Sequence, residues 1–437
     1  MPKDNLMEKI VSLCKRRGFV YPGSEIYGGL ASTYDYGPLG AELKKNIKDA
    51  WWQYFIRQRD DMVGLDGGII LNPKIWEASG HVKNFKDPLV ECKKCHQRFR
   101  PDKLPDAIKC PECGGAFTEQ KMFSGLFKTT IGATEKEGLT AYLRPETAQA
   151  IFADYKNVLD STNKKIPFGI GQIGKAFRNE ITTGNFIFRT IEFEQMEIEY
   201  FIAPDADWNK IFEEWLKYIY GFADLIGLPV DNFSNHEIPE ADRAFYSKRT
   251  IDIEYKFPWA LDELWAIAYR TDYDLSAHQQ ASGQDLTYFN EATKQRFIPH
   301  VIEPTFGVDR TMLALLATAY AEEKTDNGET RIVLKLKPSM APFKVAVFPL
   351  LANKENLIAR ARKIYNDLKS DLNCVWDDRG NIGKRYRAQD EIGTPFCVTI
   401  DFDSLENNDV TVRNRDSMKQ ERIKIEELKK YLTEKIK

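Results

Sequence analysis

Four of the seven cysteines lie in two C-x-x-C pairs, Cys92 with Cys95 and Cys110 with Cys113, and fourteen residues separate the pairs. Two turns at this spacing can present four thiolates tetrahedrally to Zn²⁺, and the metal can then order a short loop that has no core of its own. Free buried thiols are the alternative. Because four thiolates fill the coordination sphere, we expect a structural zinc ion and interpret His96 as a neighbour of the site, not a ligand.

Arginine and aromatic side chains recur on both sides of a turn in the middle of the chain. Phe177-Arg178-Asn179-Glu180 closes a strand-like run, a turn rich in Thr and Gly spans 182–185, and Phe188-Arg189-Thr190-Ile191-Glu192-Phe193 opens a return strand. This order predicts a β-hairpin. Arginine can hold a phosphate through two parallel hydrogen bonds, and an aromatic ring can stack on a purine base. A surface hairpin with cross-strand ion pairs is the alternative interpretation.

Another arginine stands where a strand gives way to a helix, in Gly307-Val308-Asp309-Arg310. Glycine at this point allows a ligand to approach the backbone closely. Arg310 falls at the start of the helix, where its positive charge opposes the helix dipole, although Asp309 could offset it as an N-cap. An arginine in this position indicates an anionic partner.

Amphipathic helices and clustered strands surround these segments. Apolar residues recur at helical spacing in the segments 40–59, 309–323 and 353–371. Runs rich in β-branched and aromatic residues predict strands over 168–173, 186–201, 251–255, 298–303 and 332–336. Because the strands cluster together and do not alternate regularly with helices, we predict an α+β fold with an antiparallel sheet core.

The pattern changes after Leu336. Residues 337–339 are typical of a linker, and the strands and helix that follow predict a smaller α/β domain over 340–437. The larger part, 1–336, carries the four-cysteine segment 90–118 as an insertion. Neither G-x-x-x-x-G-K-[ST] nor G-x-G-x-x-G occurs, so nucleotide binding cannot be argued from those motifs.

Composition and charge exclude several classes of protein. The 437 residues are 43% hydrophobic, enough for a large core, and the net charge of −3 argues against general polyanion binding. Any nucleic-acid contact therefore needs a local basic patch, for which the tail 411–437 is the candidate, with a solvated helix face as the alternative. The amino terminus shows no apolar leader, and the longest apolar helix candidate, 311–321, falls short of the roughly 20 residues that span a bilayer. We expect a cytoplasmic protein without a membrane segment.

The arginine-bearing segments resemble the motifs of class II aminoacyl-tRNA synthetases. Motif two of that family reads F-R-x-E, a loop and R-x-x-x-F, which Arg178 and Arg189 match with their neighbours, and motif three ends in G-Φ-[ED]-R, as at Arg310. Motif one, a helix, a strand and a proline, is matched by the stretch that ends at Pro73. The segment 377–395 resembles the anticodon-binding domain that the histidyl, prolyl, threonyl and glycyl enzymes share.

Longer strings are similar, more narrowly, to the dimeric glycyl-tRNA synthetases. They extend over nearly the whole chain: Tyr34-Asp35-Tyr36-Gly37-Pro38-Leu39-Gly40, Leu143-Arg144-Pro145-Glu146-Thr147-Ala148-Gln149, Phe193-Glu194-Gln195-Met196-Glu197 and Ile382-Gly383-Lys384-Arg385-Tyr386-Arg387. The resemblance implies a homodimer that uses ATP and Mg²⁺ to convert glycine to glycyl-adenylate and then transfers it to the terminal ribose of tRNA(Gly).

The resemblance also assigns a nucleotide site. Arg178 would hold the α-phosphate of ATP, Phe193 would stack on adenine and Arg310 would meet the γ-phosphate, so that Arg178, Glu180 and Arg310 are the expected catalytic residues. The other expected nucleotide contacts are Asn179, Phe188, Arg189, Thr190, Ile191, Glu192, Glu263, Leu264, Gly307, Val308 and Asp309.

A glycine site follows in the same way. Glu146, Glu194 and Glu197 would surround the glycine ammonium, and Arg100 would contact substrate. The other expected substrate contacts are Phe193, Gln195, Met196, Glu303, Pro304, Thr305, Phe306 and Gly307. The family usually has serine where this chain has Thr305, which keeps the hydroxyl but adds a methyl group beside a pocket for the smallest amino acid.

Three alternatives compete with this interpretation. A synthetase for threonine, proline, serine or histidine would share the three motifs but not the longer strings. A noncatalytic relative, such as the synthetase-like accessory subunit of a DNA polymerase, would lose the arginines that are present here. A metal-dependent nucleic-acid binder centred on the cysteines would leave most of the chain unexplained.

Overall fold

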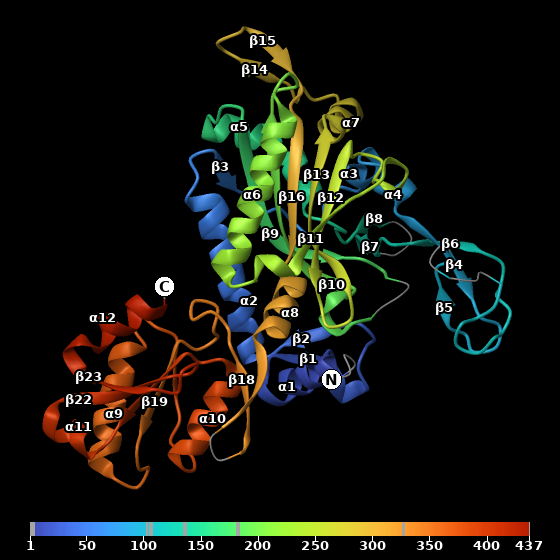
Figure 1. Cartoon of the computed structure of the whole chain (residues 1–437). Coiled ribbons are helices and arrows are strands. Elements are labelled where there is room, and N and C mark those ends of the chain that lie inside the picture. The colour runs from blue at the N-terminus through green and yellow to red at the C-terminus, as the bar shows by residue number, and fades with distance from the viewer. Residues whose placement is uncertain are drawn as a thin grey trace.

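A seven-stranded sheet forms the centre of the larger part of the chain, in a computed structural model that describes residues 5–101, 104, 108–133, 138–180, 184–325 and 328–436 (Figure 1). Its strands, in spatial order, are β11 (Phe233–Glu237), β12 (Arg249–Lys256), β13 (Leu261–Thr271), β16 (His300–Gly307), β10 (Glu192–Ile202), β9 (Phe168–Phe177) and β3 (Met62–Gly64). Neighbours are antiparallel except β3 and β9, which are parallel. The predicted antiparallel α+β core is confirmed.

The two faces of this sheet have different environments because side chains alternate along each strand. On one face, Trp51, Trp215 and Phe306 belong to one large core. Three helices supply much of that core: α2 (Pro38–Trp51, continued by a π-helical segment Trp52–Arg57), α6 (Trp208–Ile226) and α8 (Val308–Ala319). The other face is covered in part by α5 (Ala148–Thr162) and α7 (Tyr273–Ser282), through a second core that contains Phe201. The uncovered part of this second face carries the candidate site.

Two boundaries differ from the predictions. The helix predicted over 309–323 ends at Ala319, because Tyr320–Lys324 forms strand β17 and pairs with β18 (Thr330–Leu334). The strand predicted from residue 186 begins only at Glu192, since left-handed backbone at Asn185 and Phe186 leads into the short 3-10 helix η4, Phe186–Phe188. Residues 181–183 of the predicted turn lie outside the described residues.

Smaller elements surround the central sheet. At the amino terminus, α1 (Asn5–Arg17) precedes a two-stranded sheet of β1 (Val20–Pro22) and β2 (Tyr34–Tyr36), between which lies η1 (Glu25–Tyr27). The four-cysteine module projects from the side of the molecule (Figure 1). Its neighbourhood contains α3 (Pro73–Ala78), α4 (His81–Asn84), β4 (Lys86–Glu91), β5 (Arg98–Phe99), β6 (Lys121–Ser124), β7 (Lys128–Ile131) and β8 (Leu139–Tyr142). A hairpin of β14 (Tyr288–Asn290) and β15 (Gln295–Phe297) stands at the far end.

A second sheet with its own apolar core follows residue 344. Its strand order is β20 (Cys374–Trp376), β19 (Val345–Pro349), β21 (Phe396–Ile400), β22 (Asp409–Asn414) and β23 (Gln420–Lys424). The first three strands are parallel to one another, as in an α/β unit. The helices of this domain are α9 (Glu355–Leu368), α10 (Ile382–Ile392), α11 (Phe402–Asn407) and α12 (Ile425–Ile436).

A buried ionic junction joins the two parts of the chain. Asp390 on α10 accepts hydrogen bonds from Arg413 (2.8 and 3.0 Å) and from Arg331 of β18 (2.9 Å). Arg415 donates to the carbonyl oxygens of Gly393 (2.7 Å) and Leu336 (2.8 Å). The basic tail is therefore not one exposed patch, because two of its arginines are structural.

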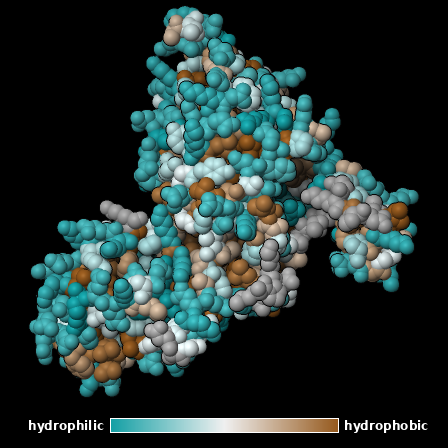
Figure 2. All heavy atoms as spheres, in the orientation of Figure 1, coloured by the Kyte–Doolittle hydropathy of each residue, from teal (hydrophilic) through white to brown (hydrophobic). Residues whose placement is uncertain are grey.

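No helix of the described segments is long and apolar enough to cross a membrane. Hydrophilic side chains cover most of the face drawn in Figure 2, and hydrophobic ones lie in smaller separate groups.

Candidate functional site

A cavity of about 370 Å³ opens on the uncovered face of the central sheet, which is within the usual size of ligand pockets. Phe193, Gln195 and Glu197 of β10 line it, whereas Met196 and Ile198 of the same strand point into the core on the opposite face. Most of the residues expected from the sequence line the cavity: Glu146, Arg178, Glu180, Phe188, Arg189, Thr190, Phe193, Glu194, Gln195, Glu197, Glu263, Leu264, Glu303, Thr305, Gly307, Asp309 and Arg310.

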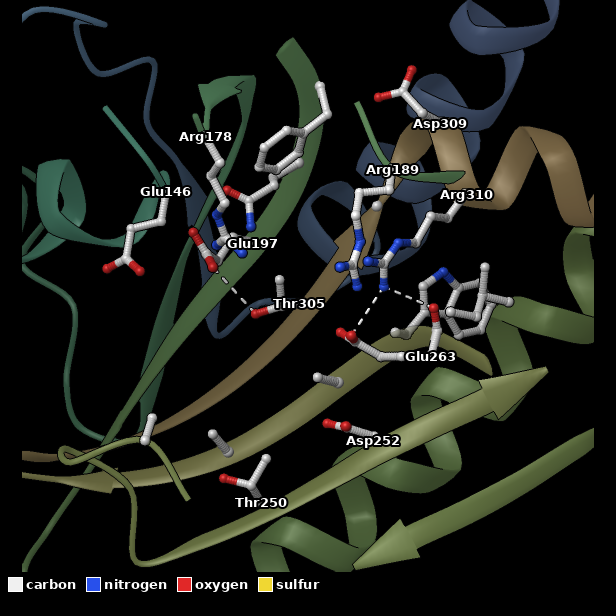
Figure 3. A pocket seen from close by; sticks show the side chains of 18 of the residues that line it. Glu146, Arg178, Arg189, Glu197, Thr250, Asp252, Glu263, Thr305, Asp309 and Arg310 are labelled. Carbon is white, nitrogen blue, oxygen red and sulfur yellow. Dashed lines mark hydrogen bonds and ion pairs between the residues drawn. The ribbon is translucent and has the colours of Figure 1, made fainter. Parts of the chain in front are cut away.

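Three guanidinium groups line the cavity: those of Arg189 and Arg310 lie side by side at one end, and that of Arg178 lies between them and the glutamates (Figure 3). Arg178 donates to the carbonyl of Pro145 (3.0 Å) and lies over the ring of Phe193, 5.3 Å from its centre. Neither Arg178 nor Arg189 has a carboxylate within ion-pair distance in the part of the chain that the structure describes. Unpaired guanidinium groups that face a cavity favour an anionic ligand.

Arg310 is held in place by the protein. Its Nη1 lies 3.0 Å from the carboxylate of Glu263 and donates to the Glu263 carbonyl at 2.8 Å, while its Nε donates to the carbonyl of Phe188. The guanidinium also lies 4.4 Å from the centre of the Phe188 ring. Phe257 and Trp259 pack against Phe188 edge to face, so a rigid aromatic wall supports this end of the cavity.

Asp309 does not cap the helix as the sequence suggested. The N-cap of α8 is Gly307, and the buried carboxylate of Asp309 accepts hydrogen bonds from Tyr36, from Lys44 (2.6 Å) and from the backbone of Glu194 (2.7 Å). Lys44 and Lys48 of α2 also pair with the Glu194 side chain, at 3.1 and 2.7 Å. The charge of Glu194 is therefore already balanced by lysines. Its ion pairs are with α2, and it is separate from the acidic end of the cavity.

The other end of the cavity is acidic. Glu197 accepts hydrogen bonds from the backbone amide of Thr147 (3.1 Å) and its hydroxyl, and from the hydroxyl of Thr305 (3.2 Å). Glu303 pairs with Arg270 at 3.0 Å, and Glu146 lies 3.1 Å from His81. These glutamates come from a loop and two adjacent strands and form a cluster that suits an ammonium group.

The surroundings shift the acidity of these carboxyl groups. Burial tends to raise the pKa of Glu146, but His81 and Arg270 outweigh it and leave that pKa below its usual value. Burial and the charge of Glu146 together raise the pKa of Glu197. At the arginine end, burial and the nearby Glu263 raise the pKa of Asp252 to about 6. Strongly perturbed carboxyl groups that face one cavity are typical of functional sites.

Eight expected site residues do not line the cavity. Met196, Phe306 and Val308 are fully buried in the core behind the sheet. Arg100 lies in the four-cysteine module, where it pairs with Asp87 at 2.9 Å. The remaining ones are Asn179, Ile191, Glu192 and Pro304. Apart from Arg100, these residues come from contiguous motif strings, and strand alternation directs part of any such string away from a ligand.

Other residues of the site escaped the sequence analysis. Arg270 is fully buried; it binds Asp274 through two hydrogen bonds of 2.8 Å and lies 3.8 Å from the centre of the Tyr246 ring. Asp252 and Tyr246 line the cavity. The available signal was the spacing of Arg270 and Asp274, which are four residues apart, with Arg270 directly after the apolar run 264–269.

The four cysteines of the module lie together as their spacing predicts. The Sγ atoms of Cys92 and Cys113 are 3.5 Å apart, those of Cys95 and Cys110 are 3.6 Å apart, and all four lie within 4.8 Å of one another. Thiolates that bind zinc tetrahedrally at about 2.3 Å are separated by about 3.8 Å, so the cluster fits the ion. His96 instead contacts Glu91 at 3.2 Å, with most of its side chain exposed.

Comparison with known proteins connects these features to described families. Residues 127–319 match the tRNA synthetase class II core domain (G, H, P, S and T), and residues 344–435 match the anticodon binding domain. A glycine–tRNA ligase from Thermobifida fusca is 53% identical, with 99% of each chain covered. Those from Clostridium kluyveri and Lachnospira eligens are 50% and 51% identical, with at least 99% of each chain covered.

Proposed function

Since this chain belongs to the glycine–tRNA ligases, which are class II aminoacyl-tRNA synthetases, we propose how its own residues divide the reaction. The enzyme converts glycine and ATP to glycyl-adenylate with release of pyrophosphate, and then transfers glycine to the 3′-terminal ribose of tRNA(Gly) with release of AMP. The observation that carries the proposal is the distribution of charge along the cavity, which has Arg189 and Arg310 at one end, Glu146 and Glu197 at the other, and Arg178 between them.

The arginine end receives ATP. Attack of the glycine carboxylate on the α-phosphate needs no protein nucleophile, but it brings two anions together. Arg178 would hold the α-phosphate and Arg310 the γ-phosphate, with Phe193 beside the adenine. Glu180 and Arg189, which also line this end, complete the nucleotide site.

Magnesium would be held at the same end. Glu263 and Asp252 offer carboxylate oxygens, which Mg²⁺ prefers as ligands, next to the expected position of the phosphates. Bound there, the ion would help to neutralise the charge of the phosphates. Arg310, fixed by Glu263, would orient the leaving pyrophosphate.

The acidic end receives glycine. Glu146, Glu197 and Glu303 would accept the ammonium group, and Arg270 supports them from behind. Ala266, Ala268 and Thr305 line this part of the cavity, so a substrate side chain would meet their methyl groups. Because larger amino acids are excluded sterically, no editing step is needed.

Pyrophosphate exchange with different amino acids tests the assignment. We expect glycine to drive labelled pyrophosphate into ATP, and threonine, serine, proline and histidine to fail. Exchange with one of the others in place of glycine would instead identify a sibling synthetase.

We propose that zinc orders the four-cysteine module in a reducing, cytoplasmic environment. Substituting Cys110 with serine is expected to remove one equivalent of zinc, because the ligand set loses a thiolate. Atomic emission measures the metal, and limited proteolysis should show new cleavage within 90–118. The matched control is Cys374→Ser in the carboxy-terminal core, which should keep the zinc content. Zinc retained in full by Cys110→Ser would contradict the ligand set.

The carboxy-terminal domain would contact tRNA through the exposed part of α10. Lys384 is exposed on the first turn, whereas Arg385 is buried and donates to the carbonyls of Pro349 (2.5 Å) and Gly380 (2.8 Å). Tyr386 packs on Phe348 and its hydroxyl forms a hydrogen bond with that of Thr399, so its ring is part of the core of the domain and does not serve as a platform on which a base stacks.

Changing Lys384 to alanine is therefore expected to raise KM for tRNA about three- to tenfold, since one phosphate contact is lost, and to leave adenylate formation unchanged. Aminoacylation and exchange assays on the same preparation measure both steps. The effect on KM should shrink as salt increases. Equal loss of activity in both assays would mean that tRNA binding and adenylate formation are not assigned separately to the two domains.

We propose that the enzyme is a homodimer that buries the loop around η1. Ile26 (88% exposed), Tyr27 (87%) and Leu30 (61%) form an apolar group that a single chain leaves in solvent. Tyr27→Asp is expected to shift the protein toward monomer in light scattering coupled to gel filtration, because a charge would enter the interface. Tyr218→Asp, on the exposed side of α6, is the control. A dimer unaffected by Tyr27→Asp would place the interface elsewhere.

A further inference from the structure

Glu199 is a fully buried carboxyl group just behind the acidic end of the cavity. Its side chain has no solvent exposure, and no donor among the described residues gives a hydrogen bond to either of its oxygens. The register that pairs Glu197 with Thr305 and Tyr200 with Ile302 places Glu199 beside Glu303 on the same face of the sheet. One oxygen from each of Glu197, Glu199 and Glu303 lies within 4.8 Å of the other two.

The charges around Glu199 do not compensate a carboxylate. The groups that act on it are Glu303 on β16, Arg270 at the end of β13, Glu197 on the same strand and Asp274 on α7. Three of these are acids. The guanidinium of Arg270 already gives two hydrogen bonds to Asp274 and one to Glu303. An ionised Glu199 would therefore be a buried charge without a partner, which proteins avoid by protonating the group.

We propose that Glu199 is a positioning residue, held as the neutral carboxylic acid, whose O–H donates to Glu303 and turns the charge of Glu303 toward the glycine ammonium. The inference rests on the proposed function of the acidic end. A protonated carboxyl has one O–H donor, and oxygens of Glu303 and Glu197 lie within 4.8 Å of an oxygen of Glu199 as possible acceptors. Burial and the charge of Glu303 raise the pKa of Glu199 well above its usual value. Burial also raises the pKa of Glu303, but the ion pair with Arg270 at 3.0 Å opposes that shift and keeps the charge of the pair on Glu303.

The neutral form has a consequence for substrate binding. Glu146, Glu197 and Glu303 line the cavity, whereas Glu199 does not. A neutral Glu199 adds no charge to the pocket, but it fixes the orientation of Glu303, which does carry a charge. The competing arrangement is a cation bound by the three carboxylates of Glu197, Glu199 and Glu303, which would require Glu199 to be ionised.

Two substitutions at this position separate the possibilities. Glu199→Gln is neutral, has the same shape and keeps a donor, so we expect it to preserve kcat and KM for glycine between pH 6.5 and 8.5. Glu199→Leu has similar volume but no donor, and we expect it to raise KM for glycine about tenfold, the size of one hydrogen bond to a charged group. Its melting temperature should not fall, because the change removes a buried polar group.

Infrared difference spectra between the wild type and Glu199→Gln provide a direct readout. The carbonyl stretch of a protonated carboxyl should be present in the wild type and absent from the variant. This measurement keeps the inference testable even where Glu199→Leu fails to fold.

Two outcomes would overturn the inference. Glu199→Gln could lose as much glycine activation as Glu303→Gln does. That outcome would show that Glu199 acts as a charge or binds a cation. Metal analysis of the wild type and Glu199→Gln would identify a bound cation. Unchanged KM in a folded Glu199→Leu would show that no donor is needed. Failure of the wild type to exchange pyrophosphate with glycine would instead refute the proposed function, so the two failures remain distinct.

Discussion

Replacing Arg178 by alanine is expected to lower glycine-dependent pyrophosphate exchange about 100- to 1000-fold, mainly through kcat. The guanidinium faces the cavity without a carboxylate partner, so its loss leaves the phosphate charge uncompensated while the fold stays intact. Exchange kinetics, with circular dichroism as the check on folding, measure the effect. Arg178→Lys should recover little, because a lysine cannot make two parallel hydrogen bonds to a phosphate.

Lys175→Ala is the matched control for this prediction. Lys175 is exposed on β9, three residues before Arg178, pairs with Glu192 and does not line the cavity. Its activity should stay at the wild-type level. Full exchange activity in Arg178→Ala would remove this arginine from the mechanism.

Glu197→Gln is expected to raise KM for glycine at least 100-fold. The substitution keeps the shape but removes a buried charge that faces the ammonium, and an unbalanced buried ion pair costs about 3–5 kcal/mol. The amide group also presents N–H donors toward Thr147 and Thr305, which now donate to the carboxylate. Steady-state exchange at varied glycine measures KM.

The KM for ATP should change little in Glu197→Gln, because Glu197 lies at the opposite end of the cavity from Arg310. Glu237→Gln on the edge strand β11 is the control and should behave as wild type. Equal changes in both KM values would mean that the substitution disturbs the whole sheet and not the glycine end alone.

Local patterns predicted much of the fold. The spacing of the cysteines, the helical periodicity of 40–59 and 353–371, and the clustering of strands all correspond to features of the structure. The helix predicted over 309–323 was wrong at its carboxyl end. Tyr320–Lys324 is a strand that pairs with β18, and the periodicity within the segment does not reveal this partner.

Only those site residues that belong to recognisable motifs could be predicted from the sequence. Arg178 and Arg310 are part of recognisable strings, but Arg270, Asp252 and Glu199 acquire their positions from strands that are distant in sequence. Glu199 illustrates the difference. In the sequence it is one more acid in a strand. Only the register against β16 shows that it lies beside Glu303, where the guanidinium of Arg270 is already bonded to Glu303 and Asp274.

The junction at Asp390 bears on how the enzyme recognises RNA. Arg331 and Arg413 clamp this aspartate from the two parts of the chain, and Arg16 and Arg17 of α1 pair with the adjacent Glu391 at 3.0 and 2.5 Å. These contacts fix the position of α10 relative to the part of the chain that carries the cavity. We therefore expect the enzyme to select RNAs by the distance between their acceptor end and their anticodon. An RNA in which this distance is wrong would reach either the cavity or α10, but not both.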